Sequence, residues 1–333
     1  MLTPTRNKAI IKQLEAETQT ASGILIPDNV QKKQKSGIVI AIGEYDKDEY
    51  GEIFVGDTVC FSEYAGEKVN FENGELLVMH PGVFLSVIRD GKHQALGSNL
   101  IVEIESKYKK TETVGNIELL LDVPITSNGE EIFFNKGERL KYSGKVVSIP
   151  TVQPKDDANN LIDAILKTGD EIYFRYMNVS DIRAYLDKKI DDYSETYTIR
   201  VPYEDVFCTV RDSEIIPVGD WVLGEPFIEG NGVMVKMPTG NNGVTNIKVE
   251  YYENTNLIKS VNKKESTNQV VARHIGSFKG KKSELKCGDI VYSKVGINFE
   301  NEINGKRYFC FLQNYQADAV LGNVKCDNCL CKK

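Results

Sequence analysis

The chain has 333 residues, of which 41% are hydrophobic and 27% charged, and this apolar content excludes an intrinsically disordered protein. At roughly 150 residues per domain the length fits two domains, and three shorter ones fit as well. The 41 Lys and Arg residues are outnumbered by 48 Asp and Glu, the net charge is −7, and no arginine-rich block occurs. We therefore expect no nucleic-acid partner.

The N-terminal sequence predicts a protein without a membrane partner. Its first residues, MLTPTRNKAIIKQ, lack the apolar core of a signal peptide. The longest purely aliphatic run, residues 38–42, is far shorter than the roughly 20 residues that a membrane span needs. We therefore expect a cytoplasmic localisation.

Three stretches of the chain carry the same series of patterns, which indicates three versions of one structural unit. Each begins with a β-like apolar run that ends on Gly or Pro, at 36–43, 143–150 and, more loosely, 270–276. A turn containing Gly-Asp and a strand follow, at 55–61, 168–174 and 287–292. A closing strand comes last, at 83–90, 206–212 and, in a degraded copy, 317–321. The recurrence predicts domains at 1–92, 95–214 and 217–322, followed by a short tail at 323–333.

The segments within each unit favour small antiparallel β-barrels. They are short, rich in Val, Ile, Tyr and Phe, and separated by Gly, Asp and Asn turns. Two short helical insertions are predicted in the middle unit, at 159–167 and 180–191, because apolar residues recur there at helical spacing. Ser180 is the expected N-cap of the second helix.

Residues 15–34 form a long polar segment around one aliphatic triplet, Ile24-Leu25-Ile26. Such a segment cannot build a core of its own, and a loop of this length in a compact domain is usually functional or disordered. An exposed triplet of this kind is a candidate element for binding a partner. The residues alone also fit a short strand that folds onto its own barrel.

Residues 3–92 resemble the GroES-type co-chaperonin over nearly the whole length of that family. The resemblance is carried by KQLEAETQTASGILIPD at 12–28, SGIV at 36–39, VGD at 55–57, YAG at 64–66 and ELL at 75–77. It implies an all-β chain of three tandem GroES-like, partly open β-barrels, of which the second and third are diverged. It also implies a co-chaperonin that caps a GroEL-type chaperonin and assists protein folding.

The resemblance assigns roles to particular segments of the first unit. Residues 15–34 become the mobile loop, and its chaperonin-binding residues are Gly23, Ile24, Leu25, Ile26 and Pro27. The edge strands at 8–12 and 84–88 would pair between subunits of a heptameric ring. The acid-rich stretch 44–52 lies where the family has a roof hairpin, although its composition alone indicates a solvated loop.

The chain also departs from the family, because a typical co-chaperonin subunit is a single unit. The second unit has an echo of the loop at 111–122, in which Glu118 interrupts the triplet, and either a second docking loop or an ordinary strand fits. The third unit has a predicted hairpin around 230–243 in the corresponding place. The extra units leave an alternative function open, in which the barrels are a structural component of a virus particle or another large assembly.

The seven cysteines are expected to be reduced thiols, because their spacing indicates no disulfide framework. Four of them lie singly in apolar runs: Cys60, Cys208, Cys287 and Cys310. The tail has a CxxCxC cluster, Cys326, Cys329 and Cys331, whose spacing suits zinc although a tetrahedral site needs a fourth ligand. A disordered, redox-sensitive tail is the alternative.

Familiar enzyme motifs are missing from the sequence. It has no G-x-S-x-G elbow, no H-E-x-x-H helix and no G-x-G-x-x-G dinucleotide-binding unit, and 276–283 is one residue short of a phosphate loop. We therefore predict no catalytic residues and no cofactor; the one candidate for a cofactor is zinc at the tail cysteines.

Overall fold

The computed structural model describes most of the chain, with gaps. The described residues are 3–14, 36–62, 65–71, 74–106, 111–114, 117–120, 140–156, 158–175, 196–226, 232–236, 246–253, 256–264, 269–276, 283–293, 299–313 and 317–323. Three predicted features lie outside them: the loop at 15–34, the helix at 180–191 and the tail cysteines. The described residues form two compact units, Met1–Val210 and Arg211–Lys333. The three predicted domain boundaries stay a prediction.

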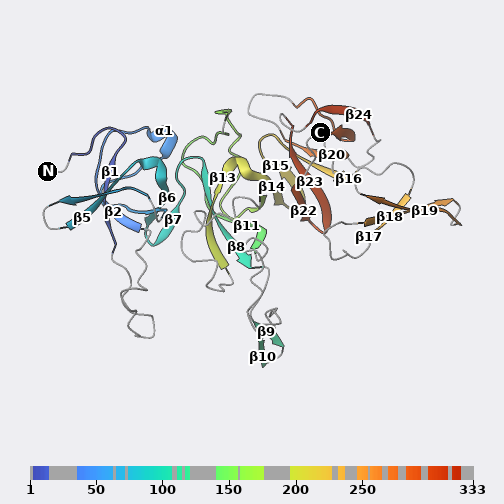
Figure 1. Ribbon diagram of the computed structural model, residues 1–333, viewed down its shortest axis with the longest axis horizontal. Helices are drawn as coiled ribbons and strands as arrows, with labels where there is room; N and C mark the ends of the chain where they lie inside the picture. The colour runs from blue at the N-terminus through green and yellow to red at the C-terminus, as the bar shows by residue number, and fades with distance from the viewer. Residues whose placement is uncertain are drawn as a thin grey trace. The chain divides into compact units, whose positions relative to one another are not determined.

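The first sheet has seven antiparallel strands in the order β4-β5-β1-β2-β3-β6-β7. Figure 1 labels β1, β2, β5, β6 and β7 of this sheet, at the blue end of the colour bar. The strands are β1 (Ala9–Gln13), β2 (Ser36–Ile42), β3 (Thr58–Phe61), β4 (Glu67–Phe71), β5 (Gly74–Met79), β6 (Phe84–Arg89) and β7 (Lys92–Gln94). A short helix, α1 (Lys47–Tyr50), follows β2, and a 3-10 turn, η1 (Pro81–Val83), precedes β6.

One face of the first sheet buries an apolar cluster, as the alternation of residue types predicts. Along β5, for example, Leu77 and Met79 are buried and Val78 between them is not. The cluster consists of Ala9, Ile11, Val39, Ile53, Val59, Phe61, Leu77, Met79, Phe84, Val87 and Leu96. The first sheet therefore has a hydrophobic core of its own.

The prediction that residues 8–12 and 84–88 are edge strands is wrong. Strand β1 pairs with both β2 and β5, and β6 lies between β3 and β7. The reason at β6 is the turn Asp90–Gly91, whose φ values of 52° and 70° fold the chain back so that β7 covers β6. The edges of this sheet are β4 and β7.

The second sheet has six strands in the order β13-β8-β11-β12-β14-β15. They are β8 (Asn99–Ser106), β11 (Leu140–Ser148), β12 (Glu171–Phe174), β13 (Thr196–Pro202), β14 (Val206–Arg211) and β15 (Glu214–Pro217). A 3-10 turn, η5 (Tyr203–Asp205), precedes β14, as η1 precedes β6. A separate two-stranded sheet consists of β9 (Thr111–Val114) and β10 (Ile117–Leu120).

The helix predicted at 159–167 is not formed, and this segment is irregular. Asn159 has a φ of 61°, which is incompatible with a right-handed helix. The carboxylate of Asp156 accepts the amide of Asn160 at 2.6 Å, so the local polar bonds favour a turn. Ile162 is still buried, which shows that the apolar spacing reflected burial without a helix.

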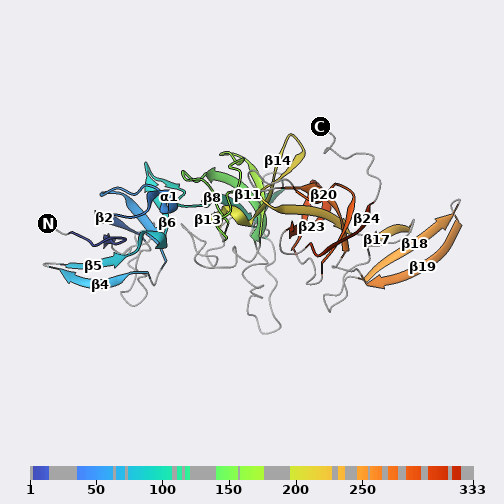
Figure 2. The ribbon, with the colours of Figure 1, turned by 90° about the horizontal axis from the view of Figure 1, so that it is seen from above.

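The third sheet has six strands in the order β22-β23-β16-β20-β21-β24. They are β16 (Trp221–Pro226), β20 (Gln269–Ile275), β21 (Asp289–Tyr292), β22 (Phe299–Ile303), β23 (Lys306–Leu312) and β24 (Ala319–Asn323). Its core contains Val222, Val270, Ala272, Leu285, Val291, Phe309 and Phe311. Figure 2 shows a separate antiparallel sheet of β17 (Gly232–Lys236), β18 (Asn246–Glu253) and β19 (Asn256–Lys264).

The three large sheets follow one another along the chain and share one strand order. Strands β5-β1-β2-β3-β6 of the first sheet correspond to β13-β8-β11-β12-β14 of the second and to β23-β16-β20-β21-β24 of the third. The all-β prediction is therefore confirmed, with a large antiparallel sheet in each predicted unit. In the part of the chain that the structure describes, no helix is long and apolar enough to cross a membrane.

Candidate functional site

The ends of the predicted loop are held together at one end of the β1–β2 pair. Gln13 pairs with Gly37, and the amide of Leu14 donates to the carbonyl of Ser36 at 3.0 Å. A Cβ atom at Gly37 would lie 2.5 Å from Cγ2 of Ile11, so this close approach requires glycine. The described residues on either side of 15–35 therefore form a rigid base.

The predicted binding residues lie within that connection and outside the described residues. They are Gly23, Ile24, Leu25, Ile26 and Pro27. Their role as a binding element stays a prediction, whereas the paired strands on either side of the connection are an observation.

The acid-rich stretch lies at the other end of the same strand pair. Ala9 pairs with Ile42 there, and the amide of Gly43 donates to the carbonyl of Lys8 at 2.9 Å. The stretch contains α1, whose N-cap Asp46 accepts the amides of Asp48 and Glu49, where the resemblance implied a hairpin. Asp46, Asp48 and Glu49 are all exposed, as a solvated stretch requires.

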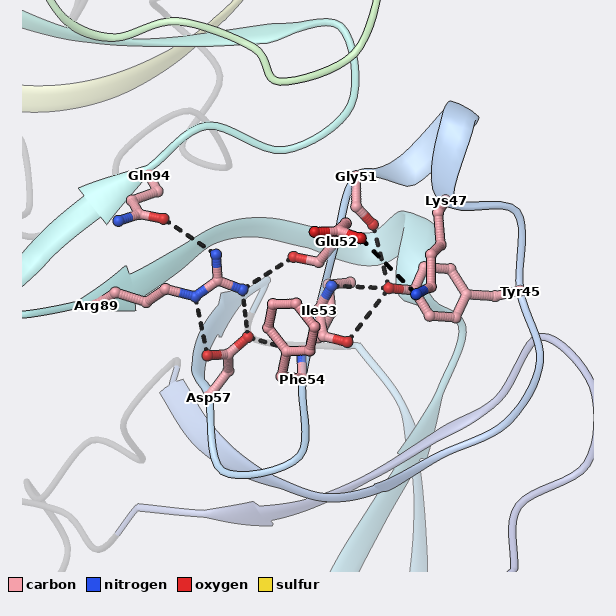
Figure 3. Close-up of polar contacts among 9 residues, drawn as sticks. All are labelled: Tyr45, Lys47, Gly51, Glu52, Ile53, Phe54, Asp57, Arg89 and Gln94. Carbon is pink, nitrogen blue, oxygen red and sulfur yellow. Dashed lines mark hydrogen bonds and ion pairs between the residues drawn. The ribbon is translucent and has the colours of Figure 1, made fainter.

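A cluster of hydrogen bonds and ion pairs holds the segment between α1 and β3 in place (Figure 3). Arg89 donates from Nε to Oδ1 of Asp57 at 3.0 Å and from an η nitrogen to Oδ2 at 2.6 Å, a bidentate ion pair. The same guanidinium donates to the carbonyl of Glu52 and to the side chain of Gln94, at 3.0 and 3.2 Å. It also lies 5.0 Å from the ring centre of Phe54, within cation–π range. One arginine thus connects β6, β7 and the turn before β3.

The ion pair changes the acidity of both partners. Burial raises the pKa of Asp57, but the hydrogen bonds from Arg89 and from the amide of Phe54, with the charge of Arg89, outweigh it and lower that pKa. The hydrogen bond to Asp57 raises the pKa of Arg89 in turn. The pair is therefore fully charged at neutral pH.

Tyr45 forms the second part of the cluster. Its hydroxyl accepts the amide of Ile53 at 2.7 Å and lies within hydrogen-bond distance of the carbonyls of Gly51 and Ile53. Burial raises the pKa of Tyr45, and the carboxylates of Glu52 and Asp57 add to this effect. These contacts close the loop after α1 and have no catalytic geometry.

The sequence patterns single out Asp57 but not its ion-pair partner Arg89. Asp57 belongs to the Gly-Asp turn that recurs in the three units, whereas Arg89 lies within the predicted closing strand at 83–90 and carries no role of its own there. A usable signal was present, because Arg89-Asp90 recurs as Arg211-Asp212 at the end of the corresponding strand.

The expectation of reduced cysteines is wrong at Cys287. Cys60, Cys208 and Cys310 are buried thiols within strands and form no disulfide bond, whereas Cys287 is disulfide-bonded. The physical difference is location: Cys287 lies in a turn and is partly exposed, so its sulfur can reach another thiol. Within the described ranges no group of three or more His, Cys, Asp or Glu could hold a metal ion, and the tail cysteines lie outside those ranges.

The segment 111–122 of the second unit, which resembles the loop, forms strands where the structure describes it. Residues 111–114 and 117–120 pair as β9 and β10, and Val114 is opposite Ile117. These residues therefore form strands, and whether they also dock to a partner stays a prediction. The hairpin predicted around 230–243 corresponds to β17, which pairs with β18, although residues 237–245 lie outside the described part.

Comparison with known proteins identifies the first unit. Residues 1–88 match the family described as Chaperonin 10 Kd subunit. A co-chaperonin GroES of Bifidobacterium animalis subsp. lactis (strain AD011) is 44% identical over 94 residues, which are 27% of this chain and 96% of the relative. The chain belongs to the chaperonin 10 Kd subunit family.

Other GroES relatives align over the same length. Co-chaperonin GroES of Cupriavidus necator is 45% identical over 92 residues, and that of Bifidobacterium longum (strain NCC 2705) is 41% identical over 92 residues. Each alignment covers 26% of this chain and 95 or 96% of the relative. The family resemblance is therefore confirmed for the first sheet, and these alignments do not extend to the second and third sheets.

Proposed function

We propose that this protein is a cytoplasmic, non-enzymatic co-chaperonin, which binds a GroEL-type chaperonin through the loop at 15–34 and assists protein folding. The observation that carries the proposal is the 44% identity to a co-chaperonin GroES over 96% of that relative. The paired strands at the loop base support it, because a rigid base reduces the number of loop conformations that binding must restrict.

The loop anchor is the triplet Ile24-Leu25-Ile26, and Gly23 and Pro27 shape the chain around it. Burying three aliphatic side chains contributes roughly 1.5–3 kcal/mol each. Ordering loop residues costs about 1–2 kcal/mol each, so five ordered residues offset most of that gain. One loop therefore binds weakly and reversibly.

Tight capping then requires several loops that act together in a ring. Once one loop is bound, the other loops of the same ring bind as intramolecular events at high effective concentration. The ring that we propose is heptameric, so that seven loops reach a sevenfold partner. Because β1 and β6 already have neighbours within the chain, the subunit contacts use other surfaces than these two strands.

The alternative is a structural component of a virus particle or another large assembly. It is favoured by one observation, which is that the aligned part is only 26 or 27% of a chain with two further large sheets. This alternative requires stable self-assembly and no nucleotide-dependent binding of a chaperonin.

The deciding experiment compares two serine variants of the full chain. In one, Ile24, Leu25 and Ile26 are all replaced by Ser; in the matched control, Ile117, Leu119 and Leu120 are replaced. Native mass spectrometry with a GroEL-type chaperonin and ATP or ADP measures the complex. We expect the first variant to lose the complex and the control to retain it.

The outcomes separate the two functions. Undiminished binding by the Ile24-Leu25-Ile26 variant would overturn the docking assignment. A wild-type chain that assembles with itself and never binds the chaperonin, in either nucleotide, would support the structural component. Loss of binding in the control as well would assign a second docking element to β10.

A further inference from the structure

Cys287 lies in the turn that precedes β21, and both of its neighbours in this turn are held by hydrogen bonds. The amide of Gly288 donates to the carbonyl of Ala272 at 2.8 Å. The amide of Lys286 donates to the carboxylate of Asp289, also at 2.8 Å. Cys287 itself is partly exposed. The turn therefore presents this cysteine at a fixed place on the surface of the third sheet.

The disulfide partner of Cys287 follows by elimination. The chain has seven cysteines, and Cys287 is disulfide-bonded. Three of the others form no disulfide bond: Cys60, Cys208 and Cys310. The remaining three are those of the tail, which lie outside the described residues: Cys326, Cys329 and Cys331. Within this chain, the partner of Cys287 is therefore one of the tail cysteines.

The described strands bring the start of the tail to the same place. Strands β21 and β24 are antiparallel, and Asp289 is opposite Asn323. Cys287 comes shortly before Asp289 and Cys326 shortly after Asn323, so both lie beyond the same end of this strand pair. The chain from Asn323 to Cys326 spans at most about 10 Å. The tail cluster therefore begins within reach of Cys287.

We propose that Cys287 is the fourth ligand of a zinc site, and that the three tail cysteines are its other ligands. A structural zinc site is closed by four ligands, often all thiolates, and the CxxCxC cluster supplies one too few. The disulfide bond shows that the sulfur of Cys287 reaches a sulfur of this cluster. The disulfide bond and the zinc site are then the oxidised and the reduced state of the same four cysteines.

Two features of the sequence support a site at this turn. The equivalent residues in the turns of the other two sheets are Val55 and Thr168, so the cysteine occurs only where the tail follows. Zinc with four thiolates carries excess negative charge, and nearby lysines favour the thiolate form of cysteine. Lysines lie next to these cysteines in the sequence: Lys286, Lys325, Lys332 and Lys333.

The two states interconvert by simple chemistry. A phosphine cleaves the S–S bond with oxygen taken from water, so that both sulfurs become thiols and the phosphine becomes its oxide. Zinc then displaces the thiol protons, which pass to the buffer. In the oxidised state Cys287 and one tail cysteine are withheld from the metal, so zinc should bind more weakly. This inference does not depend on the co-chaperonin function, because the loop at 15–34 belongs to another unit.

The test compares Cys287→Ser with the matched control Val55→Ser in the full chain. Val55 is the equivalent residue of the first turn and is 62% exposed, so the control introduces the same hydroxyl far along the chain from the cysteines. Competition with a chromogenic chelator measures the zinc affinity of the phosphine-reduced proteins. Cys287→Ser should weaken binding by about 100-fold or more, since even residues that only support a ligand contribute about 10- to 100-fold. The control should bind zinc as the wild type does.

Cobalt(II) in place of zinc counts the bound thiolates, because each thiolate–cobalt bond adds to the charge-transfer absorption. The wild type should have the absorption of four thiolates. Cys287→Ser should have about three quarters of it, since three of four thiolate ligands remain. Full absorption in this variant would overturn the proposal.

Labelling of the reduced wild type with iodoacetamide gives a readout that needs no variant. Zinc should protect Cys287 and the tail cysteines over the same range of zinc concentration. If Cys287 stays reactive where the tail is protected, or if Cys287→Ser binds zinc as tightly as the wild type, the proposal is wrong and the fourth ligand is Asp327, another chain or water. A reduced wild type that binds no zinc would also overturn it.

Discussion

The amide of Gly56 donates to the carbonyl of Val39 at 2.8 Å, and the same bond closes the corresponding turn in the other two large sheets. The equivalent pairs, both also at 2.8 Å, are Gly169 with Val146 and Gly288 with Ala272. All three glycines have φ between 92° and 95°. The Gly-Asp pair that recurs in the sequence therefore forms the same backbone turn in all three large sheets.

The aspartate of each Gly-Asp pair completes the turn. Its carboxylate accepts the amide of the residue three positions earlier, at 2.8 Å for Asp57, 2.7 Å for Asp170 and 2.8 Å for Asp289. A side-chain acceptor at this place offers the turn a bond that the strand ladder cannot provide. Glycine supplies the backbone angle and aspartate supplies the acceptor, which explains why the pair recurs as a unit.

Gly56→Ala should destabilise the first sheet by about 1–2 kcal/mol, because φ of 95° is costly for any residue with a Cβ atom. A new Cβ there would meet nothing within 4 Å, so the cost is conformational and not steric. The matched control is Gly74→Ala, which also has open space but no positive φ. The measurement is the free energy of local unfolding from hydrogen exchange of β2 and β3. Equal effects of the two variants would contradict the strain argument.

The Asp57–Arg89 ion pair should show a coupling free energy of about 1–2 kcal/mol at pH 7 in a double-mutant cycle with Asp57→Asn and Arg89→Gln. Its side chains are 11% and 30% exposed, so solvent screens the pair only in part. The exposed pair Lys68–Glu75 is the control, with a coupling below about 1 kcal/mol.

The pH dependence of that coupling has a definite sign. The pKa of Asp57 is lower in the folded chain than in the unfolded one, so the stabilisation is fully present above about pH 4. It is lost as the pH falls through the lower folded pKa. A coupling that stays constant down to about pH 2 would contradict the assignment.

The strands and turns of this protein were predictable because their signals are local. The alternation of apolar residues and the three Gly-Asp turns require only neighbouring residues, and they placed β2, β3, β11, β12 and β21 correctly. The helix at 159–167 failed because burial of Ile162 at helical spacing did not need a helix, while the bond from Asn160 to Asp156 favoured a turn.

The errors at strand edges have a different cause. Whether β1 is an edge depends on β5, which pairs with it from far along the chain, and whether β6 is an edge depends on β7, which follows it after a turn. Asp90-Gly91 is a turn signal in the sequence, but the predicted domain boundary at residue 92 falls directly after it, so a return strand is not expected there. The partner of Asp57 was missed likewise, because Arg89 meets it only across the sheet.

His274 should make the third sheet less stable at mildly acidic pH. Burial lowers its pKa, and the charges of Lys306 and Arg273 add to this effect while those of Glu225 and Glu214 oppose it. The unfolded chain therefore binds a proton that the folded chain does not, below the ordinary pKa of about 6.5. Stability should fall between pH 7.5 and 5.5 by at most about 1.4 kcal/mol per pH unit.

The check is hydrogen exchange of β20 in the wild type and in His274→Phe. The phenyl ring can keep the edge-to-face contact with Tyr308, in which the ring centres lie 5.5 Å apart. In the variant, the stability of β20 should no longer fall with pH. If its stability falls as steeply as in the wild type, groups other than His274 cause the effect.

Cysteine labelling should separate the four cysteines that the structure describes, Cys60, Cys208, Cys287 and Cys310, into two classes. In the native protein Cys60, Cys208 and Cys310 should resist iodoacetamide because they are buried, and burial also raises the pKa of the Cys310 thiol. Cys287 should become reactive only after mild reduction, since it is disulfide-bonded and partly exposed. Mass spectrometry of the labelled peptides measures both classes. Rapid labelling of Cys310 in the folded state would contradict its burial.

The tail cysteines should bind zinc when they are reduced. Three thiolates in a CxxCxC spacing are soft donors that suit this ion, and a fourth ligand completes a tetrahedral site. Inductively coupled plasma mass spectrometry after dialysis, under reducing conditions, should find about one zinc per chain. Replacing Cys326, Cys329 and Cys331 by Ser should remove it, because no thiolate then remains in the cluster. The control Lys332→Ser should retain it, and equal zinc content in both variants would favour the alternative of a redox-sensitive tail.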